Sequence, residues 1–117
     1  MSAKILNKNG TITIDNEVIA RIAGVTATDC YGIVGMAAKN LRDGFVHLLK
    51  IESLSKGVKL AINGNSLSIS LHIIVEYGTN IPAICETLAD NVKYQVEEFV
   101  GLDVESIDIL VEGVRVD

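Results

Sequence analysis

The feature that most constrains the fold is a run of alternating apolar and polar residues between Gly57 and Tyr77. Asn63-Gly64 divides the run, and this dipeptide is typical of the tight turn between two antiparallel strands. Side chains in the longer second arm point alternately to the two faces of a sheet, which predicts one buried face and one wet face. The apolar set is Leu67, Ile69, Leu71, Ile73, Val75 and Tyr77, and the polar set is Ser66, Ser68, Ser70, His72 and Glu76. The sequence therefore predicts a β-hairpin over residues 57–77.

Apolar residues at helical spacing flank this hairpin on both sides. Residues 16–29 are predicted as a helix that follows a short strand at residues 10–14, and Asp15-Asn16-Glu17 supplies its cap and an acidic first turn. After a glycine-containing break at residues 31–35, residues 36–50 indicate a second helix, although Gly44 weakens the pattern. Asn80 and Pro82 begin a third helix, and Gly101 ends it. Its apolar stripe is predicted to be Ile84, Cys85, Leu88, Val92, Val96, Phe99 and Val100.

A final strand over residues 107–116 changes phase at Gly113, as it would at a β-bulge. The predicted order is thus βα(α)ββαβ, an α+β fold of two layers in which a mostly antiparallel sheet carries helices on one face. The chain, residues 1–117, fits a single domain, because its length is typical of one and no linker interrupts it. Aromatic residues make up only 4% of the chain and Trp is absent, so the core must be built from Ile, Val, Leu and Ala.

Charge and hydropathy exclude several kinds of partner. The net charge of -5 repels phosphate backbones and anionic membranes, so nucleic acid is not expected as a partner. The longest apolar run, residues 71–75 with His72 inside it, is far shorter than the roughly 20 residues of a membrane span. The N-terminus lacks the apolar stretch of an export signal, which predicts a cytoplasmic protein. Cys30 and Cys85 show no metal-binding spacing and are predicted to be small buried hydrophobic residues.

No catalytic constellation, metal site or cofactor motif emerges from the sequence. The histidines, His47 and His72, have no motif around them, and His72 falls among serines on the wet strand face. An acidic stretch at residues 103–112 lacks the calcium-loop pattern, and its carboxylates fit the solvated face of a strand. Neither common glycine-rich phosphate-binding motif occurs. The chain is therefore predicted to be a non-enzymatic protein that binds other proteins and uses no cofactor.

Two other functions stay open. Gly32-Ile33-Val34-Gly35 is a G-x-x-G between two predicted helices, and this order resembles a KH-type nucleic-acid domain. A KH loop clamps a nucleotide backbone and gains from basic residues, whereas here the centre is Ile-Val in an acidic chain. Cys30 beside Tyr31 is the candidate nucleophile of a small thiol-dependent enzyme, but it falls at a helix C-terminus, whereas nucleophilic thiols usually lie at the N-terminus.

Predicted loops supply the candidate interaction patch, because binding residues concentrate on loops. Its members are Tyr31, Gly32, Ile33, Val34 and Gly35 of the glycine turn, together with Tyr77, Gly78 and Asn80. Alternatively, Ile33 and Val34 fill the core and the two glycines permit a tight apolar turn. The long second arm of the hairpin also bears on interaction, since it must pair with further strands of its own sheet or with a second copy of the chain.

An ordered set of motifs across the chain resembles a known family. The motifs are Gly10-x-Ile12-x-Ile14-x-x-Glu17-Val18, Ile22-Ala23, Cys30-Tyr31-Gly32-Ile33-Val34-Gly35-Met36-Ala37, Gly57-Val58-Lys59, Val75-Glu76-Tyr77-Gly78-x-Asn80-Ile81-Pro82, Val92-x-x-x-Val96 and Gly101-Leu102-x-Val104. Together they resemble the alkaline-shock, or envelope-stress-response, family of small cytosolic proteins in Gram-positive bacteria, from about Gly10 to Val116. The chain ends at Asp117, directly after its last strand, and so looks like the compact, tail-free subgroup.

This resemblance implies an α+β fold, a cytoplasmic location, no assigned enzymatic activity, and a role linked to cell-envelope or alkaline stress. Some relatives self-associate and reach the membrane through an anchoring partner. The resemblance therefore implies homo-oligomers and membrane association only through another protein. It supplies no established active site, so no functional residue is carried over to this chain.

Overall fold

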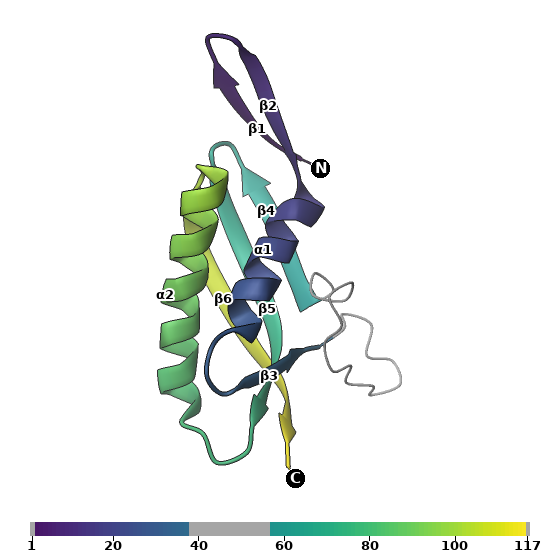
Figure 1. The fold of residues 1–117 in the computed structure, drawn as a ribbon, viewed down its shortest axis with the longest axis vertical. Coiled ribbons are helices and arrows are strands. Elements are labelled where there is room, and N and C mark those ends of the chain that lie inside the picture. The colour runs from purple at the N-terminus through teal and green to yellow at the C-terminus, as the bar shows by residue number, and fades with distance from the viewer. Residues whose placement is uncertain (1, 38–56, 117) are drawn as a thin grey trace.

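The computed structural model describes residues 2–37 and 57–116 of the chain. In chain order these residues form β1 (Ser2–Asn7), β2 (Gly10–Asp15), α1 (Asn16–Thr28), β3 (Ile33–Met36), β4 (Val58–Asn63), β5 (Ser66–Glu76), α2 (Ile81–Val100) and β6 (Asp103–Arg115). Figure 1 shows two layers, a twisted sheet with α1 and α2 across one face, and a separate hairpin beyond the end of the sheet. The predicted α+β fold, with helices on one face, is confirmed.

β5 is the central strand of the main sheet. On one edge it pairs antiparallel with β4 over residues 66–71 and with β3 over residues 73–75, so that β4 and β3 lie end to end. On the other edge β6 runs parallel to it over residues 66–76. A parallel partner is possible because α2 carries the chain back to the starting end of β5 (Figure 1). Both edges of the long second arm are thus paired within the chain.

The core lies between the sheet and the two helices. It is formed by Leu67, Ile69, Leu71, Ile73 and Val75 of β5, Ile84, Leu88, Val92, Val96 and Val100 of α2, and Ile19, Ala23 and Ala27 of α1, with Ile33, Met36, Leu102 and Val104 at its ends. Burying each of the larger aliphatic side chains contributes about 1.5–3 kcal/mol. No aromatic side chain of the described residues is buried. The prediction of an aliphatic core therefore agrees with the structure of this part of the chain.

Short polar motifs set the ends of the helices. The Asp15 carboxylate accepts a hydrogen bond from the N–H of Glu17 at 3.3 Å, and the Asn80 amide oxygen accepts one from Ala83 at 3.1 Å. Gly101 has a φ of 82°, the left-handed conformation that commonly ends a helix. The predicted starts of α1 and α2 and the predicted end of α2 are confirmed.

The hairpin predicted at Asn63-Gly64 is confirmed as the turn between β4 and β5. Asn63 and Ser66 are partners, so Gly64 and Asn65 are the two central residues, and Gly64 has a φ of 63°. Glycine supplies a positive φ at this first central position with little steric cost. The phase change predicted at Gly113 is also present, because the register of β6 against β5 shifts just before this residue.

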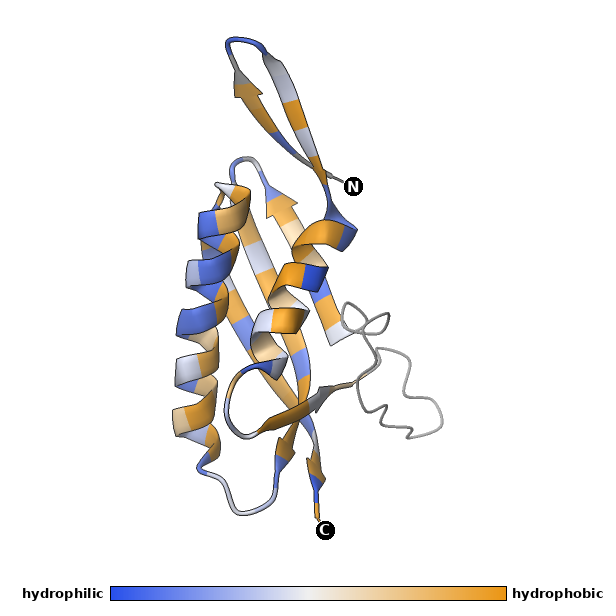
Figure 2. Cartoon of the chain, viewed as in Figure 1, coloured by the Kyte–Doolittle hydropathy of each residue, from blue (hydrophilic) through white to orange (hydrophobic). Residues whose placement is uncertain are grey.

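The hairpin of β1 and β2 projects beyond the end of the main sheet (Figure 1). Its two six-residue strands pair antiparallel with each other, and neither pairs with another described strand. Ile5 and Ile14 pack against the edge of the core, whereas Leu6 is 81% exposed. Figure 2 shows apolar segments on both strands of this projecting arm. The arm makes the molecule elongated, with extents of 54 × 28 × 21 Å.

Three local predictions need correction. No prediction covers β1, so the described order is ββαβββαβ rather than one that begins with a single strand. Residues 33–36 are not a break followed by a helix but a strand, because Ile33 and Met36 fill the core while the backbone pairs with β5. The rest of the predicted helix at residues 36–50 lies outside the described residues. Tyr77 does not continue the buried face, since β5 ends at Glu76.

Candidate interaction surface

The predicted patch residues gather at the end of the domain where β5 leads into α2. The backbone N–H of Glu76 donates to the carbonyl oxygen of Gly32 at 2.9 Å, which joins the glycine turn to this loop. Gly32 has a φ of 87°, and a Cβ added there would overlap Cδ1 of Ile84. Glycine is therefore required both by the backbone conformation and by the close approach of α2.

The patch divides into an exposed part and an inward part. Its exposed members are Tyr31, Tyr77, Gly78 and Asn80, and its half-buried members are Gly32 and Val34. Ile33 is only 7% exposed and Gly35 is buried within β3, so both belong to the interior. This is the arrangement of the alternative interpretation, in which Ile33 fills the core. The large apolar side chains of the patch that remain accessible are the two tyrosines, with 86% of Tyr31 and 71% of Tyr77 exposed.

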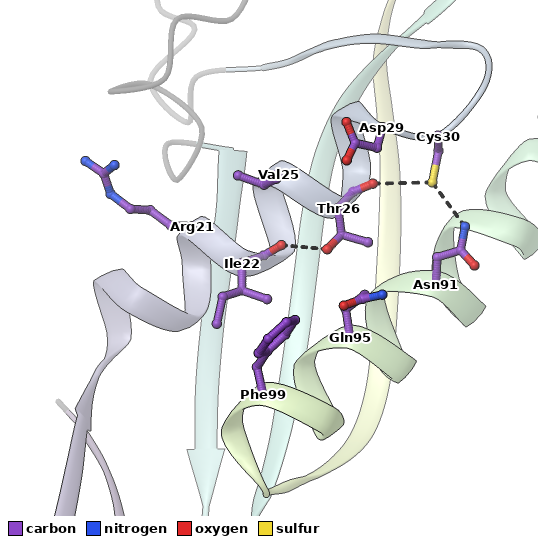
Figure 3. A pocket seen from close by; sticks show the side chains of 9 residues that line it. All are labelled: Arg21, Ile22, Val25, Thr26, Asp29, Cys30, Asn91, Gln95 and Phe99. Carbon is purple, nitrogen blue, oxygen red and sulfur yellow. Dashed lines mark hydrogen bonds between the residues drawn. The ribbon is translucent and has the colours of Figure 1, made fainter.

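Two depressions, which share Cys30 as a lining residue, lie along the helices. The smaller one, of about 250 Å³, is lined by Cys30, Tyr31, Asn80, Ala83, Ile84 and Thr87. The larger one, of about 580 Å³, is a groove between α1 and α2 that shares Cys30 with it. Figure 3 shows Ile22 and Val25 on the α1 wall and Gln95 and Phe99 on the α2 wall, with Arg21 toward one end and Asp29 toward the other. The groove thus mixes apolar side chains with polar ones, and the polar Thr26 and Gln95 lie in its middle.

Phe99 corrects the predicted apolar stripe of α2. It is 70% exposed at the rim of the groove rather than buried beside Val100. Val92, Val96 and Val100 recur every four residues and fill the row that faces the sheet. Adjacent helical residues point about 100° apart, so Phe99 cannot share that row. The exposed Val25 on α1 adds a second apolar side chain to the groove, and sequence reasoning did not identify this surface.

The cysteines do not form a nucleophilic site in the part of the chain that the structure describes. Cys30 Sγ donates to the carbonyl oxygen of Thr26 at 3.5 Å and accepts from Nδ2 of Asn91 at 3.5 Å. These partners are a carbonyl and an amide, and neither can take a thiol proton. Burial raises the pKa of the Cys85 thiol, which disfavours the reactive thiolate. Both cysteines are free and half-buried.

His72 lies on the sheet face that points away from the helices. Its Nδ1 is 2.7 Å from Oε2 of Glu112, and its side chain is 15% exposed. The other histidine, His47, lies outside the described residues. Within residues 2–37 and 57–116, no three His, Cys, Asp or Glu side chains are grouped so that they could hold a metal ion. His72 is thus a structural partner of Glu112 in this face rather than part of a recognisable site.

The G-x-x-G motif does not form the loop that a KH-type domain would need. Its central residues, Ile33 and Val34, are extended in β3, and Gly35 pairs with Ile74 of β5. A nucleotide-clamping loop presents its backbone to the ligand, whereas the backbone of this segment pairs with β5 in the sheet. The interpretation of these residues as a turn between two helices is therefore wrong.

These features define a small α+β domain with a groove between two helices and a projecting β-hairpin. The chain belongs to the alkaline-shock family named ASP23, and the model of this family matches residues 4–116. The family is described as having a cell envelope-related function. The resemblance found in the sequence motifs is therefore confirmed.

Several curated proteins are similar to this chain. The uncharacterized protein YloU of Bacillus subtilis (strain 168) is 47% identical, with 99% of this chain and 98% of that protein aligned. The uncharacterized protein Spy1614 of Streptococcus pyogenes serotype M6 is 32% identical over 99% of this chain and 97% of its own length. A stress response regulator gls24 homolog of Streptococcus pyogenes serotype M3 is 27% identical, over 91% of this chain and 59% of that protein. No solved structure gives a significant match.

Within the described residues, no helix is both long enough and apolar enough to cross a membrane.

Proposed function

We propose that this chain is a non-enzymatic, self-associating protein-interaction module that acts in the cytoplasm during cell-envelope or alkaline stress. Two findings support the role in envelope or alkaline stress: the family is described as cell envelope-related, and the gls24 homolog is named a stress response regulator. Its partners are other proteins, including a second copy of the chain, and it reaches a membrane only through such a partner. It uses no cofactor and does not bind nucleic acid.

The observation that carries this proposal is the set of large apolar side chains that the fold leaves outside its core. Phe99 and Val25, 70% and 45% exposed, face the groove between the helices, and Leu6, 81% exposed, lies on the projecting hairpin. The core does not need them, because the sheet and both helices already bury one another. Apolar side chains that gather at a groove or on an arm mark contact surfaces, whereas single scattered ones do not.

Self-association is tested by sedimentation velocity over a wide range of protein concentrations. We expect the average mass of the wild-type chain to rise with concentration. Leu6→Ser, Phe99→Ser and Tyr31→Ser each remove one exposed apolar side chain from a different candidate surface, and at least one should lower the mass. Tyr94→Ser is the matched control, because Tyr94 is 62% exposed but lines neither depression. A wild-type chain that stays monomeric at the highest attainable concentration contradicts the proposal.

The two alternative functions have direct tests of their own. Labelled RNA titrated at low salt, where phosphate contacts are strongest, should show no binding to this acidic chain. Tight, salt-sensitive binding would favour the nucleic-acid alternative instead. For the thiol-dependent enzyme, Cys30 should react with a maleimide no faster than a free thiol does. A much faster reaction would support the enzyme.

A further inference from the structure

The β1–β2 arm has an open edge and a charge opposite to that of the whole chain. β1 pairs with β2 on one side, and no described strand lies on its other side. The two strands and their turn carry Lys4 and Lys8, both exposed, and their one acidic residue is Asp15 at the base, where it caps α1. An isolated two-stranded hairpin is only marginally stable in water, so an arm of this kind gains much from a further partner.

β6 presents one open edge of the main sheet, opposite the edge that β4 and β3 form. It pairs with β5 on one side only, and its register is irregular near its beginning and again near Gly113. Between these two irregularities, residues 106–111 continue in regular register for six residues, which is the length of β1. Leu110 and Val111 in this stretch are 41% and 36% exposed. β6 therefore offers a regular, accessible segment that fits a strand as long as β1.

The charges of the two segments are complementary. Lys4 is the one charged residue of β1, and Asp108 is the one charged residue of the stretch 106–111, and both are exposed. β6 as a whole carries Asp103, Glu105, Asp108 and Glu112 against a single basic residue, Arg115. Two β6 strands placed edge to edge would bring these carboxylates together, and acidic residues on an edge strand oppose such like pairing. A basic strand meets no such repulsion.

From these features we infer that β1 of one copy adds to the open edge of β6 of a second copy, with Lys4 opposite Asp108 in an antiparallel pair. Five residues of β1, 2–6, then lie opposite residues 106–110 of the regular stretch. This inference rests on the self-association proposed above and names its interface. The register places Ile5 opposite Ile107, which packs against the core of its copy, while Ile5 packs against the core edge of its own copy, so the pair brings two apolar layers together. Leu6 then lies opposite Ser106, over the sheet edge rather than in open water. The main chain supplies hydrogen bonds, and the ion pair fixes the register.

Charge exchange tests this contact without disturbing the fold, because both side chains are exposed. We expect Lys4→Glu and Asp108→Lys, each alone, to raise the dissociation constant of the assembly about tenfold, because each replaces an attraction by a repulsion. The double variant, which swaps the charges, should return to within about threefold of wild type. Lys59→Glu and Asp90→Lys make the same charge changes on the exposed surfaces of β4 and α2 and should leave the constant unchanged. All are compared by sedimentation velocity at low salt, where surface ion pairs are screened least.

A second measurement uses the wild-type chain. A zero-length carbodiimide reagent joins a lysine amine to a carboxylate with which it is in contact. In a mixture of isotope-labelled and unlabelled chains, mass spectrometry should find Lys4 of one copy linked to Asp108 of another.

The outcomes separate this inference from the proposed function. If the wild-type chain is monomeric throughout, both are wrong. If it self-associates but Lys4→Glu and Asp108→Lys behave like their controls, or if the double variant does not recover, this interface is wrong while self-association stands. Recovery together with the Lys4 to Asp108 link supports the interface.

Discussion

Gly32→Ala is the substitution for which the structure gives the most definite magnitude. Gly32 has a φ of 87°, a conformation that costs an L-residue about 1–2 kcal/mol. The added Cβ would also overlap Cδ1 of Ile84 and lie 3.2 Å from its Cγ1. Moving the Ile84 side chain out of its rotamer well costs about 0.5–1.5 kcal/mol more. We therefore expect Gly32→Ala to lower the free energy of unfolding by roughly 2–3 kcal/mol.

Gly78 is a matched control for the backbone contribution. Its φ is 90°, and an added Cβ there would have no atom within 4 Å. Gly78→Ala should therefore show the backbone cost alone, about 1–2 kcal/mol. Ile84→Val removes the Cδ1 atom and should cost about 0.5–1.5 kcal/mol by itself. The double variant Gly32→Ala with Ile84→Val should lose less stability than the sum of the losses in the two single variants, because Ile84→Val removes the atom that the new Cβ would overlap.

Urea unfolding followed by circular dichroism gives the free energy of unfolding for all four variants, provided that the slope with urea is the same as for the wild type. A Gly32→Ala variant that is no less stable than Gly78→Ala would refute the contact with Ile84. Full additivity of Gly32→Ala and Ile84→Val would refute it independently.

Three further predictions concern the core, a helix cap and a thiol. Leu88→Ala should lower the free energy of unfolding by about 2–5 kcal/mol, whereas Phe99→Ala should change it by no more than about 0.5 kcal/mol, because Leu88 is fully buried and Phe99 is 70% exposed. Equal effects in urea unfolding would contradict the burial of α2. Asn80→Ala should cost about 1 kcal/mol through loss of the cap to Ala83, and an unchanged melting temperature would argue against that cap. Burial raises the pKa of the Cys85 thiol above its ordinary value of 9.0, so the unfolded chain loses this proton first as the pH rises. The stability that the neutral thiol contributes should be present below pH 9.0 and should be lost as the pH rises through the raised pKa. The free energy of unfolding, measured as a function of pH, should therefore decline less above pH 9.0 in Cys85→Ala than in the wild type.

The parts of the fold that sequence reasoning predicts well are those with long, regular patterns. The alternation of β5 runs from Ser66 to Ile73, so a shift of one residue would expose the core side chains of this stretch and is excluded. Likewise, α2 carries Asn80 and Pro82 at its start and Gly101 at its end. In both elements the local signals and the burial pattern agree, and such agreement makes an element predictable.

The missed strands are short and carry mixed signals. In β1 the apolar Ile5 and Leu6 are adjacent and do not alternate with polar residues, but Asn9-Gly10 at the turn to β2 is the same dipeptide that correctly predicts the turn at Asn63-Gly64. A sequence signal for the arm was therefore present. β3 is different, because two glycines flank Ile33 and Val34, and only contact with β5 from far along the chain makes this segment extended.

The groove between α1 and α2 could not be predicted from the sequence, and the reason is geometric. A helical pattern shows which residues share a face, but it does not show how far the neighbouring helix covers that face. Val25 and Phe99 are apolar residues next to buried ones, and only the packing of α1 against α2 leaves them at a rim. The candidate patch was in part predictable. Tyr31 and Tyr77 are exposed at one end of the domain as predicted, whereas Ile33 is buried in the core.

The position of β5 also bears on the order in which the fold assembles. β4 reaches β5 through a two-residue turn, so their pairing needs little loop closure, whereas β3 must find β5 across a much longer stretch of chain. Each doubling of a loop adds about 0.6 kcal/mol to the closure cost. The amides of β5 beside β4 should therefore become protected earlier in refolding than those beside β3. One continuous strand would then contain both an early and a late part of the folding pathway, and β3 would close the sheet only after the hairpin had formed.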